Sequence, residues 1–159
     1  MKLRNMTSLY LYDDRAVLCL YRLGSRVADH LYIGSAGGHF EEGELNDPKA
    51  CVLREMREEL NLTEAEISGL TLRYITMRLK NGEIRQNYYF FARLNKPRDL
   101  TSTEGILRWV PWENVEALEM PGSAKHMLLH YRDMGRYTSH IYGGITQQDH
   151  TDFVLFQEF

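Results

Sequence analysis

The sequence has no run of apolar residues approaching the roughly 18 that a membrane-spanning helix needs. Its start, MKLRNMTSLY, lacks the continuous apolar core of a signal peptide. Cysteine is scarce, since only Cys19 and Cys51 occur, and neither belongs to a closely spaced Cys or His pair. These absences argue against a membrane protein or a disulfide scaffold and favour buried, reduced thiols. We therefore expect a cytoplasmic protein.

An excess of basic charge is also missing. The net charge is −3, so the chain has no basic footprint of the kind that nucleic-acid-binding proteins carry. Nucleic acid is therefore not an expected partner, and an anionic ligand would need local cations or a bound metal. The length of 159 residues and the hydrophobic content of 43% suit one domain, 1–159, with its own core.

Two turn signals divide stretches of alternating apolar residues. One β-hairpin is expected from Ser8–Tyr12 and Arg15–Arg22. A second is expected from Gly69–Lys80 and Glu83–Leu94, which flank the hairpin dipeptide Asn81-Gly82. Further expected elements are strands at Leu31–Ser35 and Ile106–Val110, helical segments at Trp112–Leu118 and Pro121–Met134, and a final hairpin of Thr138–Ile145 with Phe153–Phe159. Together they predict an α+β domain with a mixed sheet and helices on its faces.

A helix is expected between the two hairpins. Asp47 suits the N-cap position, and Pro48 suits the first helical position, where its missing N–H costs nothing. Asn61 is a plausible end, because asparagine tolerates the left-handed conformation found there. Apolar residues recur between them at every third or fourth position: Ala50, Leu53, Met56 and Leu60.

The same helix is crowded with carboxylates. Glu55, Glu58 and Glu59 are expected on one face, after an acidic loop containing Glu44 and a turn at Gly37-Gly38. Most such runs are solvated helix faces whose ion pairs contribute under about 1 kcal/mol each. The glycine pair and the acidic loop favour another interpretation here. Three carboxylates on one face suit a hard divalent cation, and Mg²⁺ uses such ligands while bridging to substrate phosphates.

The segment 38–62 resembles the signature box of the Nudix hydrolases, of the MutT-like type. In that family the box runs Gly, five residues, Glu, seven residues, then Arg-Glu-apolar-any-Glu-Glu-any-Gly-apolar. Gly38 precedes Glu44 at the family's spacing, and the segment 54–62, REMREELNL, supplies the second half.

The segment departs from the family pattern at three places. Nine residues separate Glu44 from Arg54 where the pattern has seven, and we place the extra pair at Leu45-Asn46, in the loop. Asn61 replaces the usual glycine, and Ala36 stands where many members have proline. None of these changes removes an expected metal ligand.

The resemblance implies a Nudix α/β/α sandwich that hydrolyses a nucleoside diphosphate linked to another group, with Mg²⁺ or alternatively Mn²⁺ as cofactor. Glu58 and Glu59 would be the main metal ligands, with Glu55 and the backbone carbonyl of Gly38 contributing. Arg54 would orient the carboxylates.

Two further glutamates have expected roles by the same resemblance. Glu44 would brace the loop against the helix. Many members use an additional acid beyond the box as a ligand or base, and Glu104 is the candidate here; an ordinary loop glutamate is the alternative.

Substrate-binding residues are less clearly marked. Arg22 and Arg26 flank the loop after the second expected strand and are candidates for contacting phosphates, although solvated surface arginines are the alternative. His39, beside the glycine pair, is a further candidate for a phosphate contact. Trp109 either contacts a base or lies in the core.

The leading expectation is a pyrophosphohydrolase that converts a nucleoside triphosphate to a monophosphate and pyrophosphate, with 8-oxo-dGTP favoured over ordinary nucleotides. Alternatives are ADP-ribose, a dinucleotide polyphosphate or capped RNA as substrate, and a catalytically inactive nucleotide-binding domain. A monomer and a homodimer both remain open, because the apolar C-terminal hairpin suits either edge cover or a dimer contact.

Overall fold

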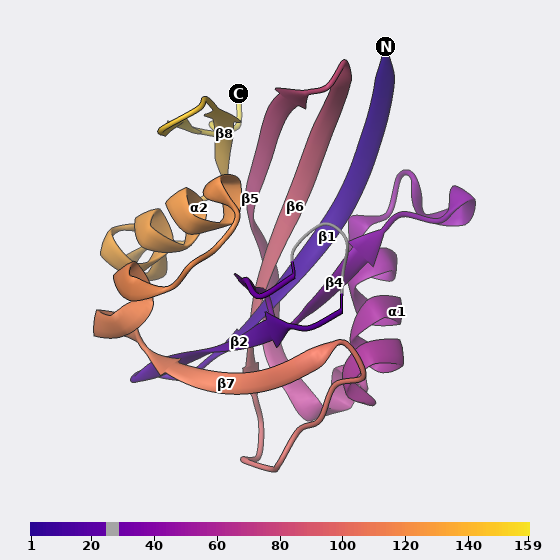
Figure 1. Cartoon of the computed structure of the whole chain (residues 1–159), viewed down its shortest axis with the longest axis vertical. Helices are drawn as coiled ribbons and strands as arrows, with labels where there is room; N and C mark the ends of the chain where they lie inside the picture. The colour runs from indigo at the N-terminus through magenta and orange to yellow at the C-terminus, as the bar shows by residue number, and fades with distance from the viewer. Residues whose placement is uncertain (25–28) are drawn as a thin grey trace.

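The computed structural model describes residues 1–24 and 29–159, and its strands in that part form one nine-stranded sheet (Figure 1). The strand order is β3-β2-β1-β6-β5-β8-β9, with β4 paired to β1 and β7 paired to β2. The strands are β1 Lys2–Tyr12, β2 Ala16–Arg22, β3 Tyr32–Ile33, β4 Ala36–His39, β5 Ile67–Lys80, β6 Glu83–Leu94, β7 Gly105–Pro111, β8 Tyr142–Thr146 and β9 Thr151–Leu155. The helices are α1 Pro48–Leu60 and α2 Gly122–Asp133, with 3₁₀ turns η1 Glu42–Glu44, η2 Glu64–Glu66, η3 Trp112–Ala117 and η4 Gly135–Tyr137.

Local sequence signals set the bounds of α1 and of the central hairpin. The Asp47 side chain accepts a hydrogen bond from the Ala50 N–H at 3.0 Å, and Asn61 ends α1 in the left-handed conformation, with φ 52°. Asn81 and Gly82 both have positive φ, as a tight hairpin between β5 and β6 requires. These predictions from the sequence are confirmed.

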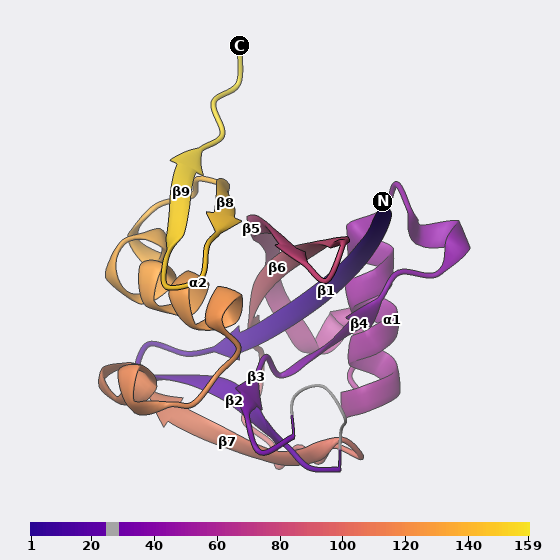
Figure 2. The same cartoon turned by 45° about the horizontal axis from the view of Figure 1, so that its top comes forward.

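The two helices cover opposite faces of the sheet, which makes the fold an α/β/α sandwich (Figure 2). Side chains alternate along β1, so that Leu9 packs in the cluster under α1 and Tyr10 in the cluster under α2. Phe90 and Phe91 divide in the same way on β6. Burial of both faces explains the short continuous apolar runs at residues 9–12 of β1 and 88–92 of β6.

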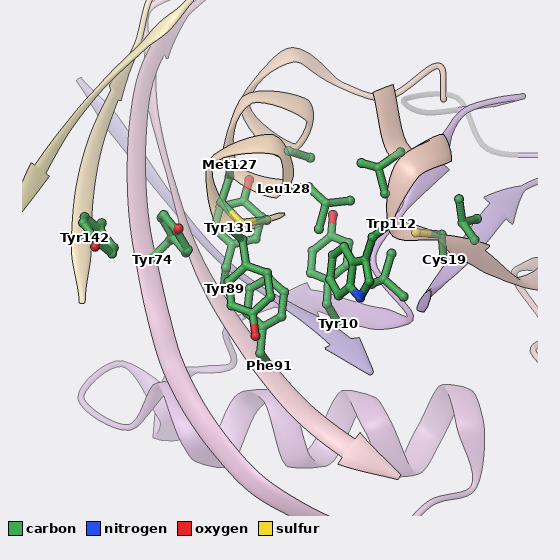
Figure 3. Packing of buried hydrophobic residues seen from close by; sticks show 14 residues of the cluster. Tyr10, Cys19, Tyr74, Tyr89, Phe91, Trp112, Met127, Leu128, Tyr131 and Tyr142 are labelled. Carbon is green, nitrogen blue, oxygen red and sulfur yellow. The ribbon is translucent and has the colours of Figure 1, made fainter. Parts of the chain in front are cut away.

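Aromatic side chains fill the layer between the sheet and α2 (Figure 3). Tyr131 of α2 stacks on Phe91 of β6, with ring centroids 3.7 Å apart and an interplanar angle of 13°. Trp112 of η3 and Tyr10 of β1 complete this cluster around Tyr131. Such pairs add about 0.5–1.5 kcal/mol beyond the burial of their area, so this layer holds α2 firmly against the sheet.

Strand pairing differs from the expectation at the first hairpin. β1 pairs with β2 only next to the turn, at Leu11–Leu18 and Tyr12–Val17. Farther along the same edge of β1, residues 6–9 pair with β4, while β6 runs parallel along the opposite edge. The C-terminal hairpin is confirmed, with the shorter strands β8 and β9. No helix in the described part is both long and apolar enough to cross a membrane.

Candidate active site

The glycine pair lies in strand β4 and not in a turn, so that expectation was wrong. Pairing with β1 holds the backbone of the glycine pair in an extended conformation, with Gly37 opposite Ser8 and Gly38 opposite Thr7. A Cβ on Gly37 would lie 2.3 Å from the Thr7 carbonyl oxygen, inside the sheet. A Cβ on Gly38 would lie 2.3 Å from Oε1 of Glu55. The two glycines therefore let a strand and a glutamate of α1 approach more closely than any side chain permits.

The backbone of this strand also holds Glu59. The Gly37 N–H donates to Oε2 of Glu59 at 3.1 Å, a contact that sequence reasoning did not find. The glycine pair was the sequence feature that could have indicated this hydrogen bond, because a strand without side chains exposes its amides to a neighbouring helix. Glu59 and Glu55 therefore both face β4.

Arg54 links the carboxylates to one another. Its guanidinium contacts Glu44 at 2.7 Å, Glu55 at 2.9 Å and Glu58 at 3.2 Å, and it donates to the His39 carbonyl oxygen at 3.0 Å. Arg54 thereby joins α1, η1 and the end of β4. The two residues added relative to the family pattern, Leu45 and Asn46, lie between η1 and α1, so the register of α1 is unaffected.

The electrostatic environments of the glutamates differ sharply. Hydrogen bonds from Arg54 lower the pKa of Glu44 to about 2. Burial raises the pKa of Glu59 to about 7, with the Glu55 and Glu104 carboxylates adding to the shift and the Gly37 N–H opposing it. Burial also raises the pKa of Glu55, against the opposing contact with Arg54. Glu59 is thus a half-buried acid with no ion-pair partner within 4 Å among the described residues, and the pKa-lowering effect of Arg22 offsets only part of the shift.

Two groups from the other side of β4 join this cluster. Arg22 ends β2 opposite Gly105 of β7, and its guanidinium lies 3.4 Å from Oε2 of Glu104. Both charges influence Glu59, because Glu104 raises its pKa and Arg22 lowers it. The charges of Glu55, Glu104 and Arg22 therefore all act on Glu59, although Arg22 and Glu104 are 82 positions apart in the chain.

The other expected substrate-binding residues lie elsewhere. By strand alternation His39 faces away from Glu55, and burial together with Arg4 and Arg85 lowers its pKa. Only its carbonyl oxygen reaches the cluster, through Arg54. Arg26 lies outside the described residues.

Trp109 is 42% exposed, so the alternative that placed it in the core was wrong. It pairs with Leu18 across β2 and β7 and therefore lies on the α1 face of the sheet. Its ring is open to solvent because no helix among the described residues covers the outer strand β7 at this point.

The donor set fits a hard divalent cation by its chemistry. Glu55, Glu58 and Glu59 offer only carboxylate oxygens, the ligands that Mg²⁺ prefers, and the buried Glu59 has a raised pKa that a nearby cation would reverse. Within the described residues no three acidic, His or Cys side chains converge on a common point. The reason is that Arg54 holds Glu55 and Glu58, while the Gly37 N–H holds Glu59.

Three solved structures illustrate the proteins that share this fold. A MutT protein from Bacillus halodurans is 22% identical, with a TM-score of 0.66 and coverage of 96% of this chain and 97% of that one. A C. elegans Ap4A hydrolase is 17% identical, with a TM-score of 0.66 and coverage of 87% and 100%. The Nudix domain of Shewanella oneidensis NrtR, complexed with ADP ribose, is 17% identical, with a TM-score of 0.59 and coverage of 87% and 89%. At these identities the likeness shows the fold.

The sequence itself gives the family. The model of the NUDIX domain matches residues 2–131, and the chain therefore belongs to the Nudix family. It is a hydrolase that acts on phosphoanhydride bonds. Among curated proteins, none matches the sequence significantly.

Proposed function

We propose that this protein is a Mg²⁺-dependent pyrophosphohydrolase that cleaves a nucleoside triphosphate to a nucleoside monophosphate and pyrophosphate. The observation that carries the proposal is the approach of Glu55 and Glu59 of α1 to the glycine strand, with the Arg22–Glu104 ion pair near enough to affect the pKa of Glu59. Desolvated carboxylates with a cation nearby support cleavage of a polyphosphate, because such groups can hold a metal and neutralise phosphate charge.

The metal would be held by the carboxylates of Glu55, Glu58 and Glu59 and the carbonyl oxygen of Gly38. When bound, Mg²⁺ would neutralise charge on the phosphate oxygens. Arg54 fixes the orientation of the glutamate side chains, and its two hydrogen bonds to Glu44 fix the orientation of Arg54.

A glutamate of this cluster carries out the proton transfer. A water oxygen attacks one phosphorus atom, a glutamate accepts its proton, and the bridging oxygen leaves with the departing phosphate. Glu59 and Glu104 are the candidates for the base. Arg22, paired to Glu104, supplies a positive charge that a substrate phosphate can approach.

Within this reaction we propose an oxidised purine nucleotide, 8-oxo-dGTP, as the favoured substrate. The exposed ring of Trp109 supports this, since it offers a planar surface to a base at the rim of the α1 face. We place the reaction in the cytoplasm, which the free buried thiols of Cys19 and Cys51 support. The apolar hairpin β8–β9 at the sheet edge leaves a monomer and a homodimer as alternatives.

The test is a hydrolysis panel in H₂¹⁸O with Mg²⁺, Mn²⁺ or EDTA, with products identified by mass spectrometry. It compares canonical triphosphates and 8-oxo-dGTP with ADP-ribose and diadenosine tetraphosphate. We expect monophosphate and pyrophosphate from the triphosphates only when metal is present, and the ¹⁸O label identifies the phosphorus attacked. Preferred cleavage of ADP-ribose or the dinucleotide would overturn the proposed substrate and retain the hydrolase.

A matched pair of variants tests the site. Glu58→Gln removes an expected ligand, and we expect it to lower kcat by about two orders of magnitude or more without unfolding the protein. Glu116→Gln is the control, because Glu116 lies in η3, is exposed, and forms among the described residues only a 3.9 Å ion pair with Arg132. Equal activity of the two variants would contradict the ligand assignment.

A further inference from the structure

A pocket of about 700 Å³ opens between the end of β5, the turn joining β8 to β9, and the start of α2. Figures 1 and 2 show α2 beginning beside these strands, on the face of the sheet opposite α1. The volume of the pocket is that of a typical small-molecule site. Its walls differ in character, because Met77, Ile145 and their neighbours are apolar whereas Arg78 and Lys80 are cationic.

The start of α2 presents unsatisfied hydrogen-bond donors to this pocket. Pro121 occupies the N-cap position, so no side chain caps the helix, and its first amides have no partner of that kind. Ser123 lines the pocket, is only 2% exposed, and has no hydrogen-bond partner for its Oγ among the described residues. A buried hydroxyl without a partner is costly, which points to a ligand that satisfies it.

Arg78 is the second unsatisfied group in the pocket. Its Nε is buried without a hydrogen-bond partner, and no carboxylate among the described residues forms an ion pair with the guanidinium. The strand register places Arg85 opposite it on β6, so its nearest cross-strand neighbour is another cation. Arginine desolvated beside like charge is unfavourable unless an anion joins it.

Among the described residues, Glu83 is the one acid paired with cations in this part of the sheet, and several cations share it. Within the described residues, Arg85, Arg4 and Lys2 approach Glu83 at 3.0, 3.5 and 3.8 Å. Arg78 therefore cannot use this carboxylate without displacing another cation. The pocket has a surplus of positive charge although the protein as a whole is acidic.

We propose that this pocket binds the phosphate group of a small phosphorylated ligand. Arg78 and Lys80 neutralise its charge, and the free amides of the α2 N-terminus together with the Ser123 hydroxyl donate hydrogen bonds to its oxygens. Phosphate suits this set because arginine and a helix N-terminus are its commonest partners in proteins.

Binding of inorganic phosphate, measured by calorimetry in EDTA, tests the site directly. We expect the wild type to bind, and Arg78→Gln to weaken binding about tenfold or more, since charge-assisted hydrogen bonds are lost. Lys80→Gln changes an exposed side chain that folding does not require, and we expect a smaller loss in the same direction. Arg98→Gln, which removes an exposed arginine paired with Glu66, is the charge-matched control.

The proposal would be overturned if the wild type did not bind phosphate in EDTA, or if Arg78→Gln and Arg98→Gln weakened binding equally. Without metal and turnover, binding does not depend on the reaction proposed above, so each proposal can fail alone. Glu58→Gln should leave phosphate binding unchanged.

Kinetics then identifies the source of the phosphate. If the group belongs to the hydrolysed substrate, Arg78→Gln raises KM and added inorganic phosphate competes with the substrate. If it belongs to a separate ligand, Arg78→Gln weakens phosphate binding and leaves KM unchanged. Either result retains the anion site and assigns it to one ligand.

Discussion

Arg54 and Glu44 form a two-bond contact across the loop that precedes α1. Nε of Arg54 donates to Oε1 of Glu44 at 2.7 Å, and Nη2 donates to Oε2 at 3.0 Å. This pairing fixes a flat guanidinium in one plane, from which its remaining N–H groups reach Glu55 and Glu58. A loop glutamate thereby sets the position of two carboxylates on the helix.

Replacing Arg54 by lysine should separate charge from geometry. Lysine keeps the positive charge but loses the planar fork, so we expect kcat to fall about tenfold to a hundredfold with a small change in Tm. Arg132→Lys is the matched control, because Arg132 forms a similar two-bond contact with Asp133 on an exposed surface. Activity and Tm would be measured for both, and equal loss of activity would contradict a positioning role for Arg54.

The same ion pair should protect the fold in acid. The lowered pKa of Glu44, about 2, means that its stabilising contribution is present above its ordinary value of 4.5 and is lost as the pH falls toward 2. We expect the wild type to lose stability over this range, measured by chemical denaturation. Glu44→Gln should show a smaller loss, and parallel curves for the two proteins would contradict the assignment.

The glycine pair gives a test in which two neighbouring residues should behave differently. An alanine at Gly38 meets the flexible end of Glu55, so Gly38→Ala should lower activity strongly with little effect on Tm. An alanine at Gly37 meets the backbone of Thr7 and would require a φ of 153°, so Gly37→Ala should lower Tm by several degrees. Similar changes in Tm for both variants would contradict this distinction.

The parts of the fold that local chemistry determines could be predicted from the sequence. Asp47, Pro48 and Asn61 define α1, and Asn81-Gly82 defines the central hairpin, because each signal acts through its own backbone. The acidic face of α1 followed from helical periodicity alone. The resemblance to the family box pointed to the same segment, whose role in catalysis remains a prediction.

What could not be predicted depends on partners distant in the chain. Gly37-Gly38 suggested a turn, but pairing with β1 makes it a strand. The position of Trp109 depends on whether a helix covers β7, which no local pattern reveals. Arg78 and Ser123 belong to no motif and meet only because α2 packs across β5.

Glu59 should make the metal-free protein less stable as the pH rises. Its folded pKa is about 7, above the ordinary value of 4.5, so between these values the folded state holds a proton that the unfolded chain has released. The stabilisation is complete below about 4.5 and is lost as the pH rises through 7. We expect Tm in EDTA to fall across this window and Glu59→Gln to flatten the curve relative to Glu116→Gln. A Glu59→Gln profile identical to that of the control would contradict the raised pKa.

The two tryptophans of the segment RWVPW should respond to mutation in opposite ways. Trp112 is 5% exposed and packs in the α2 cluster, so Trp112→Ala should cost about 3–5 kcal/mol of stability and reduce activity toward all substrates alike. Trp109 is 42% exposed, so Trp109→Ala should change Tm little. If its ring stacks on the base, KM should rise for 8-oxo-dGTP, with a smaller effect on pyrimidine triphosphates. Steady-state kinetics with purine and pyrimidine substrates, alongside thermal unfolding, would show this difference. If Trp109→Ala changed KM equally for all substrates, Trp109 would not belong to the base-binding site.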